Sequence, residues 1–149
     1  MAQFRFSLEI LLKYREDIEQ KERDELFRVT YNYQMALRAR ETLEQKRIET
    51  TRALSAKQSE GYDTQELNWY HLYLNRLEYE LEECAKRLLK LDEEVQAQKK
   101  IVIEATKKRK VLSILKAKKQ KEFILELDRK EQKEVEDWVI TRYAAKETR

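Results

Sequence analysis

The sequence predicts an all-α protein, in which two long helices form an antiparallel coiled-coil hairpin with unequal arms, the second helix overhanging the first. Three observations lead to this fold. The 149 residues include one Gly and no Pro, although turns and tight loops depend on those residues. Charged residues make up 41% of the chain. Apolar residues recur at alternating steps of three and four, which is the pattern of a coiled coil.

The first helix is expected over about residues 7–58. Ser7 is placed to cap it, and Glu9 in the first turn suits the positive end of the helix dipole. Ten positions in steps of three and four define its seam: Glu22, Leu26, Val29, Tyr33, Ala36, Arg40, Leu43, Arg47, Thr50 and Leu54. An apolar group opens the helix ahead of them: Leu8, Leu11, Leu12 and Ile18. Its spacing predicts a shift of heptad phase near Ile18.

One turn is expected, at about residues 59–64. Gly61 can adopt the left-handed conformation that ends a helix. Asp63, with Glu66 three residues later, predicts a capping box at the start of the next helix. The whole chain, residues 1–149, is therefore expected to be a single coiled-coil domain.

The second helix is expected over about residues 64–146, with a longer and more apolar seam. Its fourteen positions are Leu67, Tyr70, Leu74, Leu77, Leu81, Cys84, Leu88, Leu91, Val95, Gln98, Val102, Ala105, Arg109 and Leu112. Helices joined by so short a turn must run antiparallel. Paired positions should then sum to about 124, which puts Leu8 near Lys116 and lets residues after about 121 project past the first helix.

Composition excludes most chemistry. A single Gly cannot form a glycine-rich phosphate loop, and one Cys with one His cannot supply a usual zinc site. We therefore expect no metal and no cofactor. Two helices offer no walled pocket, so no catalytic residue and no enzymatic activity are expected. No apolar run is long enough to cross a membrane, and a net charge of +3 does not indicate nucleic-acid binding.

Two groups of residues are candidates for partner binding. Aromatic residues gather near the turn: Tyr62, Trp69, Tyr70, Tyr73 and Tyr79. They either anchor a partner or thicken a thin core, and the sequence leaves both interpretations open. The expected overhang carries large apolar residues among charges, which predicts an amphipathic surface for a partner.

Two short segments resemble a known family. The first contains Phe4, Phe6, Leu8, Leu11 and Leu12, followed by Tyr14 and Arg15. The second is the run Asp-Arg-Lys-Glu-Gln-Lys-Glu-Val-Glu-Asp at residues 128–137. Together with the single turn and the aromatic start of the second helix, they resemble the flagellar export protein FliJ family over nearly the whole chain.

The resemblance implies a soluble cytoplasmic component of the flagellar type III export apparatus, a coiled coil similar to the stalk of rotary ATPases. Its implied partners are the hexameric export ATPase and the cytoplasmic domain of the export-gate membrane protein, with export chaperones as further candidates. It would work at the cytoplasmic face of the inner membrane, without inserting into it. By position, the residues facing the gate would be Leu43, Tyr70, Tyr73 and Leu77. Those facing the ATPase would be Leu8, Leu11, Leu12, Arg129, Gln132, Lys133 and Trp138.

Other functions fit the same pattern of residues. An equivalent stalk protein of a virulence type III secretion system would have a similar sequence. A nucleic-acid-binding coiled coil would use the basic run at residues 99–121, and its binding would fall steeply with salt. A purely structural coiled coil would self-associate through its seam.

Overall fold

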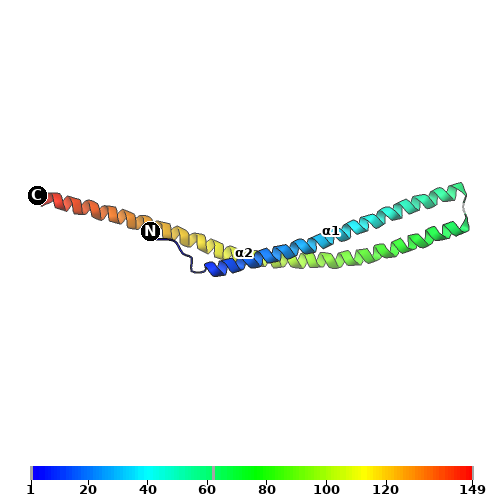
Figure 1. Cartoon of the computed structure of the whole chain (residues 1–149), viewed down its shortest axis with the longest axis horizontal. Helices are drawn as coiled ribbons and strands as arrows, with labels where there is room; N and C mark the ends of the chain where they lie inside the picture. The colour runs from blue at the N-terminus through cyan, green and yellow to red at the C-terminus, as the bar shows by residue number, and fades with distance from the viewer. Residues whose placement is uncertain (1, 62, 149) are drawn as a thin grey trace. The chain divides into compact units, whose positions relative to one another are not determined.

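In the computed structural model, which describes residues 2–61 and 63–148, two long helices are joined by a short turn (Figure 1). Helix α1 spans Glu9–Glu60 and helix α2 spans Thr64–Glu147. The helices pack against each other, and the described residues contain no strand. The predicted all-α helical hairpin is thus confirmed. Tyr62, one of the aromatic residues expected near the turn, lies outside the described residues.

Helix α1 begins slightly later than the sequence suggests. Its first hydrogen bond runs from the Leu12 N–H to the Leu8 carbonyl, at 2.8 Å. Ser7 lies in a turn just before the helix, where the Glu9 N–H donates to the Phe6 carbonyl at 3.2 Å. The observed start thus lies within two residues of the start expected at about residue 7, and Leu8 supplies the first helical acceptor.

The turn between the helices follows the expected chemistry. Gly61 has a φ of 95°, which is the left-handed conformation that favours glycine. The Asp63 side chain accepts a hydrogen bond from the Gln65 N–H at 3.3 Å, so Asp63 caps α2 as predicted. Glu66 was expected to complete a capping box, but its carboxylate accepts instead from the Lys57 ammonium at 3.4 Å. That contact joins the last turn of α1 to the first turn of α2.

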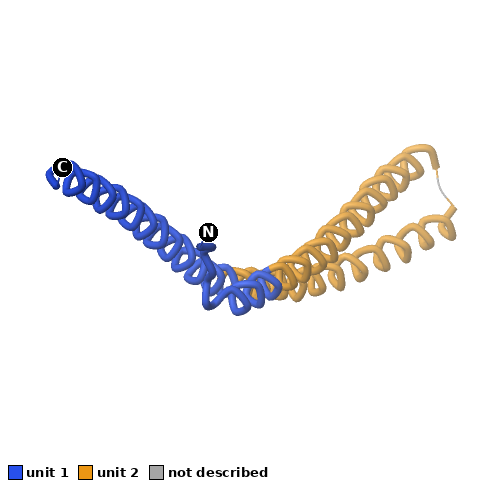
Figure 2. Tube along the Cα trace, turned by 60° about the vertical axis from the view of Figure 1, so that its left-hand side comes forward, with its two compact units in different colours: residues 1–19, 104–149 blue, residues 20–103 orange. Residues whose placement is uncertain are grey.

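The chain divides into two compact units, which Figure 2 shows in different colours. Unit 1 comprises residues 1–19 and 104–149, and unit 2 comprises residues 20–103. Each unit contains a stretch of α1 packed on a stretch of α2.

The core of unit 2 is a single row of seam residues. Its buried apolar residues are Val29, Leu54, Leu77, Leu88 and Val95. All five stand at predicted seam positions, which confirms the heptad pattern there. Gln98 is also buried at a seam position, and it is the one buried polar residue among those that the structure describes in this unit.

The core of unit 1 continues the same pattern with more polar content. Its buried residues are Leu12, Ala105, Leu112 and Glu19. The α1 seam positions from Leu54 back to Glu22 are separated by alternating steps of three and four residues. The same steps continue from Glu22 through Glu19 to Leu12 without a break. The expected phase shift near Ile18 was therefore wrong, because charged side chains occupy seam positions where apolar residues were sought.

The residues before α1 extend the packing of unit 1. The ring of Phe4 lies against the ring of Phe123 on α2, with 5.6 Å between centroids and a tilt of 51°. Such tilted pairs are favourable aromatic contacts. Phe123 and Leu127 are half-buried. Intrachain contact on α2 thus reaches beyond residue 121, where it was expected to end.

Candidate interaction surfaces

The four residues expected to face the export gate lie in unit 2, but they do not form one surface. Tyr73 is 41% exposed, whereas Leu77 is only 2% exposed and belongs to the core. Leu43 and Tyr70 are half-buried. Leu77 therefore cannot contact a partner unless the helices separate, and its place in the seam explains why it is apolar.

Three of the aromatic residues near the turn line a surface hollow. Its lining residues are Glu66, Trp69, Tyr70 and Tyr73, all on the first turns of α2. Trp69 and Tyr73 are exposed, and Tyr70 is half-buried. The residues expected to face the export gate did not include Trp69. Trp69 follows Glu66 by three residues and precedes Tyr73 by four, so all three lie on one face of the helix. We refer to these four lining residues as the aromatic hollow.

The N-terminal leucines of the expected ATPase site lie in unit 1 with different exposure. Leu8 and Leu11 are 38% and 39% exposed, but Leu12 is only 3% exposed. Leu12 stands at a seam position and packs in the core of this unit. Only Leu8 and Leu11 are therefore accessible to a partner.

The C-terminal residues of the expected ATPase site are all exposed. Arg129, Gln132 and Lys133 are spaced by three and four, so they share one face of α2. Trp138 stands nine residues after Arg129, which is half a turn out of phase at 3.6 residues per turn. Trp138 thus lies on the opposite side of the helix, where the Arg142 guanidinium stacks 4.7 Å from its ring centroid. Residues 128–148 are exposed throughout. We refer to them as the C-terminal segment.

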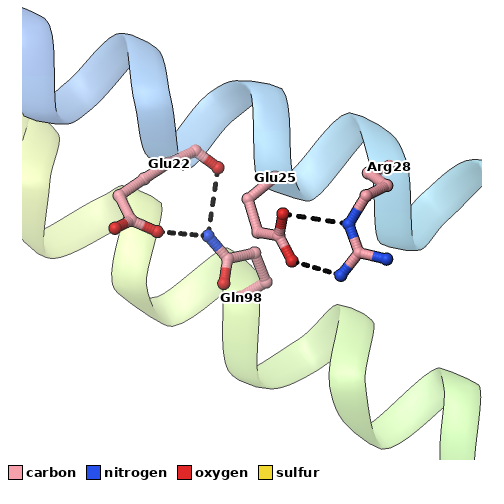
Figure 3. Close-up of polar contacts among 4 residues, drawn as sticks. All are labelled: Glu22, Glu25, Arg28 and Gln98. Carbon is pink, nitrogen blue, oxygen red and sulfur yellow. Dashed lines mark hydrogen bonds and ion pairs between the residues drawn. The ribbon is translucent and has the colours of Figure 1, made fainter.

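Polar contacts hold the seam of unit 2 near Glu22, as Figure 3 shows. The Gln98 side-chain amide donates to the Glu22 backbone carbonyl at 3.0 Å and to its carboxylate at 2.6 Å. One helical turn further along α1, Arg28 donates to the Glu25 carboxylate at 3.0 and 2.5 Å. This hydrogen bonding lowers the pKa of the Glu25 carboxyl below its ordinary value and raises the pKa of Arg28.

Ion pairs between described residues join the helices of unit 1. Arg109 donates from Nε to the Glu19 carboxylate at 2.6 Å, and Lys116 lies 2.9 Å from the Glu9 carboxylate. The residue numbers of each pair sum to 128 and 125, close to the 124 predicted for the register. In unit 2 the sums are 120 for Gln98 with Glu22 and 123 for Lys57 with Glu66. The predicted antiparallel register is therefore confirmed in both units.

Among the residues that the structure describes, no group of three or more His, Cys, Asp or Glu side chains could hold a metal ion. Cys84 is half-buried at its seam position with a free thiol. In the described part of the chain, no helix is long and apolar enough to cross a membrane.

Comparison with known proteins gives one result. The family model described as "Flagellar FliJ protein" matches residues 4–148. No curated protein and no solved structure matches the chain. The family match covers both the aromatic hollow and the C-terminal segment.

Proposed function

Because the chain belongs to the FliJ family of flagellar proteins and is thereby a component of the flagellar export apparatus, we propose that it couples the export ATPase to the export gate. In this role it is a non-enzymatic coiled coil that binds one partner through each unit. It acts in the cytoplasm, at the cytoplasmic face of the inner membrane, and needs no cofactor. Export chaperones are further proposed partners.

One observation carries this proposal: both tryptophans of the chain are exposed, Trp69 in unit 2 and Trp138 in unit 1. The aromatic hollow of unit 2 presents Trp69 and Tyr73, and the C-terminal segment of unit 1 presents Trp138. Interface energy concentrates in a few aromatic and Arg residues, so each group is a suitable anchor for a separate partner.

The C-terminal segment is suited to a partner that surrounds it. Arg129 and Trp138 lie on opposite sides of α2, so one flat surface could not contact both. A ring of subunits contacts every side of a helix that enters it. We therefore assign Arg129, Gln132, Lys133 and Trp138 to the hexameric ATPase, together with the accessible Leu8 and Leu11 of the same unit.

The aromatic hollow is suited to a partner that presents one surface. Its lining residues share a single face of α2, as a flat contact requires. We assign Trp69, Tyr70 and Tyr73 to the cytoplasmic domain of the export gate, with Leu43 at the edge of the contact. Leu77 supports this region from within the core rather than touching the gate.

Binding of two variants to both purified partners tests the proposal. Trp69→Ala with Tyr73→Ala should weaken gate binding and leave ATPase binding unchanged. Removal of residues 128–149 should abolish ATPase binding and leave gate binding unchanged. Tyr79→Ala is the matched control, because Tyr79 is exposed on α2 but does not line the hollow. If either variant lost binding to both the ATPase and the gate, the proposal that each unit binds its own partner would be contradicted.

A further inference from the structure

A second stripe of heptad spacing runs along α2 in unit 1, outside the seam. From residue 107 to residue 139, ten positions follow alternating steps of four and three. Five of them are apolar: Val111, Ile114, Leu125, Val135 and Val139. The other five are Lys107, Lys118, Lys121, Asp128 and Gln132. We call these ten residues the outer stripe. Such spacing is the pattern by which one helix packs along the length of another.

The outer stripe lies on the side of α2 that α1 does not cover. All ten positions are exposed, and the apolar ones range from 41% exposed at Val139 to 68% at Ile114. Leu112 is buried in the seam and Lys116 pairs with Glu9 of α1, so both mark the covered side of α2. Ile114 stands two residues from each of them, about 200° around the helix. An exposed aliphatic row on this side needs a partner.

Charges along this part of α2 divide into two blocks of opposite sign. Residues 105–121 contain eight Lys or Arg and no acidic residue, a net charge of +8. Residues 122–137 contain seven Asp or Glu and three Lys or Arg, a net charge of −4. Two copies of the segment packed antiparallel would place each basic block against the acidic block of the other copy. A parallel pair would instead set like charges side by side, which disfavours association.

One antiparallel register matches the outer stripe at every position. When the residue numbers across the pair sum to 246, each residue of the stripe faces a residue of the same stripe on the other copy. Val111 then faces Val135, and Lys118 faces Asp128. The remaining pairs are Lys107 with Val139, Ile114 with Gln132 and Lys121 with Leu125. In the two pairs of Lys with an aliphatic residue, the lysine stem can lie along the apolar side chain while its ammonium group stays in water.

The pairing of Lys118 with Asp128 supplies partners that unit 1 does not. Neither side chain forms an ion pair within the part of the chain that the structure describes. Lysines close by in the sequence do find carboxylates, as Lys116 does with Glu9 and Lys119 with Glu122. Two-fold symmetry makes every contact across the pair occur twice, so the register contains two such ion pairs.

We propose that the outer stripe joins two copies of this chain in an antiparallel dimer, with the two-fold axis near residue 123. The contact covers residues 107–139 of each α2, about 50 Å of helix. The proposal follows from unit 1 alone and does not depend on the ATPase or the gate. Residues 128–139 also belong to the C-terminal segment, so the dimer covers part of the surface assigned above to the ATPase. Only this consequence rests on the proposed function.

Sedimentation equilibrium of the full chain tests the dimer directly. We expect a reversible change from monomer to dimer as the protein concentration rises. The dimer should weaken as salt rises, because part of the attraction is between exposed charges. A chain that stays monomeric at every concentration up to its solubility limit would overturn the proposal.

A charge exchange tests the register. Asp128→Lys places a Lys opposite Lys118 at both symmetric contacts, so it should lower the association constant of the dimer about tenfold. Lys118→Asp combined with Asp128→Lys restores opposite charges at these contacts and should return the constant to the parent value. Every substituted side chain is exposed, so circular dichroism should show each variant fully helical. Failure of the double substitution to restore association would refute this register.

A matched control separates the outer stripe from net charge. Asp137→Lys makes the same change of charge at an exposed position that lies about half a turn from the stripe. Its effect on association should be less than about twofold, because its charge is screened from the other copy. Equal losses in Asp128→Lys and Asp137→Lys would contradict the proposal, since association would then follow net charge alone.

A spin label measures the direction of the two helices. With Cys84→Ser as background, Lys110→Cys carries one label per chain at an exposed position outside the stripe. In the proposed dimer the two labels stand 26 residues apart along the paired helices, from residue 110 to the position facing residue 136. The expected separation by electron–electron resonance is therefore about 40 Å. A separation near the interhelical spacing of about 10 Å, apart from the length of the labels, would show a parallel pair and overturn the proposal.

Discussion

Arg109 on α2 donates from Nε to the carboxylate of Glu19 on α1 at 2.6 Å, and both residues stand at seam positions of unit 1. Glu19 is only 7% exposed. A buried polar pair contributes little net stability compared with apolar residues, but it penalises registers in which either charge would lie unpaired. We therefore interpret this pair as a determinant of how the two helices align.

Removing one member of the pair should destabilise the fold. Glu19→Ala leaves the Arg109 guanidinium without its nearest carboxylate in a half-buried site. We expect a loss of about 1–3 kcal/mol in the free energy of unfolding, measured by urea denaturation followed by circular dichroism.

The double substitution Glu19→Leu with Arg109→Leu separates stability from register. It should restore the free energy of unfolding to the parent value or above it, because apolar residues replace a buried ion pair favourably. If the double variant is as unstable as Glu19→Ala, the pair stabilises the fold directly, and its interpretation as a register determinant fails.

Leu77 should matter for folding more than any other residue assigned to the gate from the sequence. Leu77→Ala removes a nearly inaccessible side chain, and such changes cost about 2–4 kcal/mol. Leu72→Ala, on an exposed position of the same helix, should change the free energy of unfolding by less than about 0.5 kcal/mol. Thermal denaturation compares the melting temperatures of the Leu77→Ala and Leu72→Ala variants. Similar melting temperatures would mean that Leu77 is not part of the core.

The register can be tested chemically without moving the helices. Lys116 lies 2.9 Å from the carboxylate of Glu9, so a zero-length carbodiimide reagent should join them by an amide bond. Digestion and mass spectrometry should identify the linked peptides from a monomer band. Lys116→Arg should remove this product, because guanidinium does not form the amide. A product found only in dimers would contradict the intramolecular hairpin.

The α2 seam was predictable from the sequence because it is nearly all apolar. Leu77, Leu88, Val95, Ala105 and Leu112 are buried where the steps of three and four place them. The turn was predictable for a similar local reason. The left-handed φ of Gly61 and the cap at Asp63 depend on neighbouring backbone groups alone.

The α1 seam in unit 1 was not predictable in the same way. Glu19 carries a charge, so a search for apolar positions passed over it, and its partner Arg109 stands ninety residues away in the chain. Two residues were wrongly counted among the candidate binding residues for a related reason. Leu12 and Leu77 are apolar because they lie in the core, and Leu77 was assigned to the gate although its heptad position had already placed it in the seam.

The pair of Glu25 and Arg28 should show a pH dependence of definite sign. Hydrogen bonds from Arg28 lower the pKa of the Glu25 carboxyl in the folded chain. Its stabilising effect is therefore present above the unfolded pKa and is lost as the pH falls through the folded pKa. Carboxyl titration by NMR should show the pKa of Glu25 rising in Arg28→Gln. An unchanged value would mean that the pair does not persist in solution.

The two aromatic side chains Phe123 and Trp138 should separate folding from partner binding. Phe123 is half-buried against Phe4, so Phe123→Ala should cost about 1–2 kcal/mol in the free energy of unfolding. Trp138 lies exposed in the C-terminal segment, where Arg142 stacks on it, so Trp138→Ala should leave the melting temperature nearly unchanged. Because exposed Trp residues are frequent anchors of interfaces, the same substitution should weaken ATPase binding at least tenfold. Thermal denaturation and a binding titration with the purified ATPase measure both effects.

Normal ATPase binding by Trp138→Ala would remove Trp138 from the proposed interface. A fall in melting temperature as large as that of Phe123→Ala would show instead that the C-terminal segment packs on another part of the isolated chain.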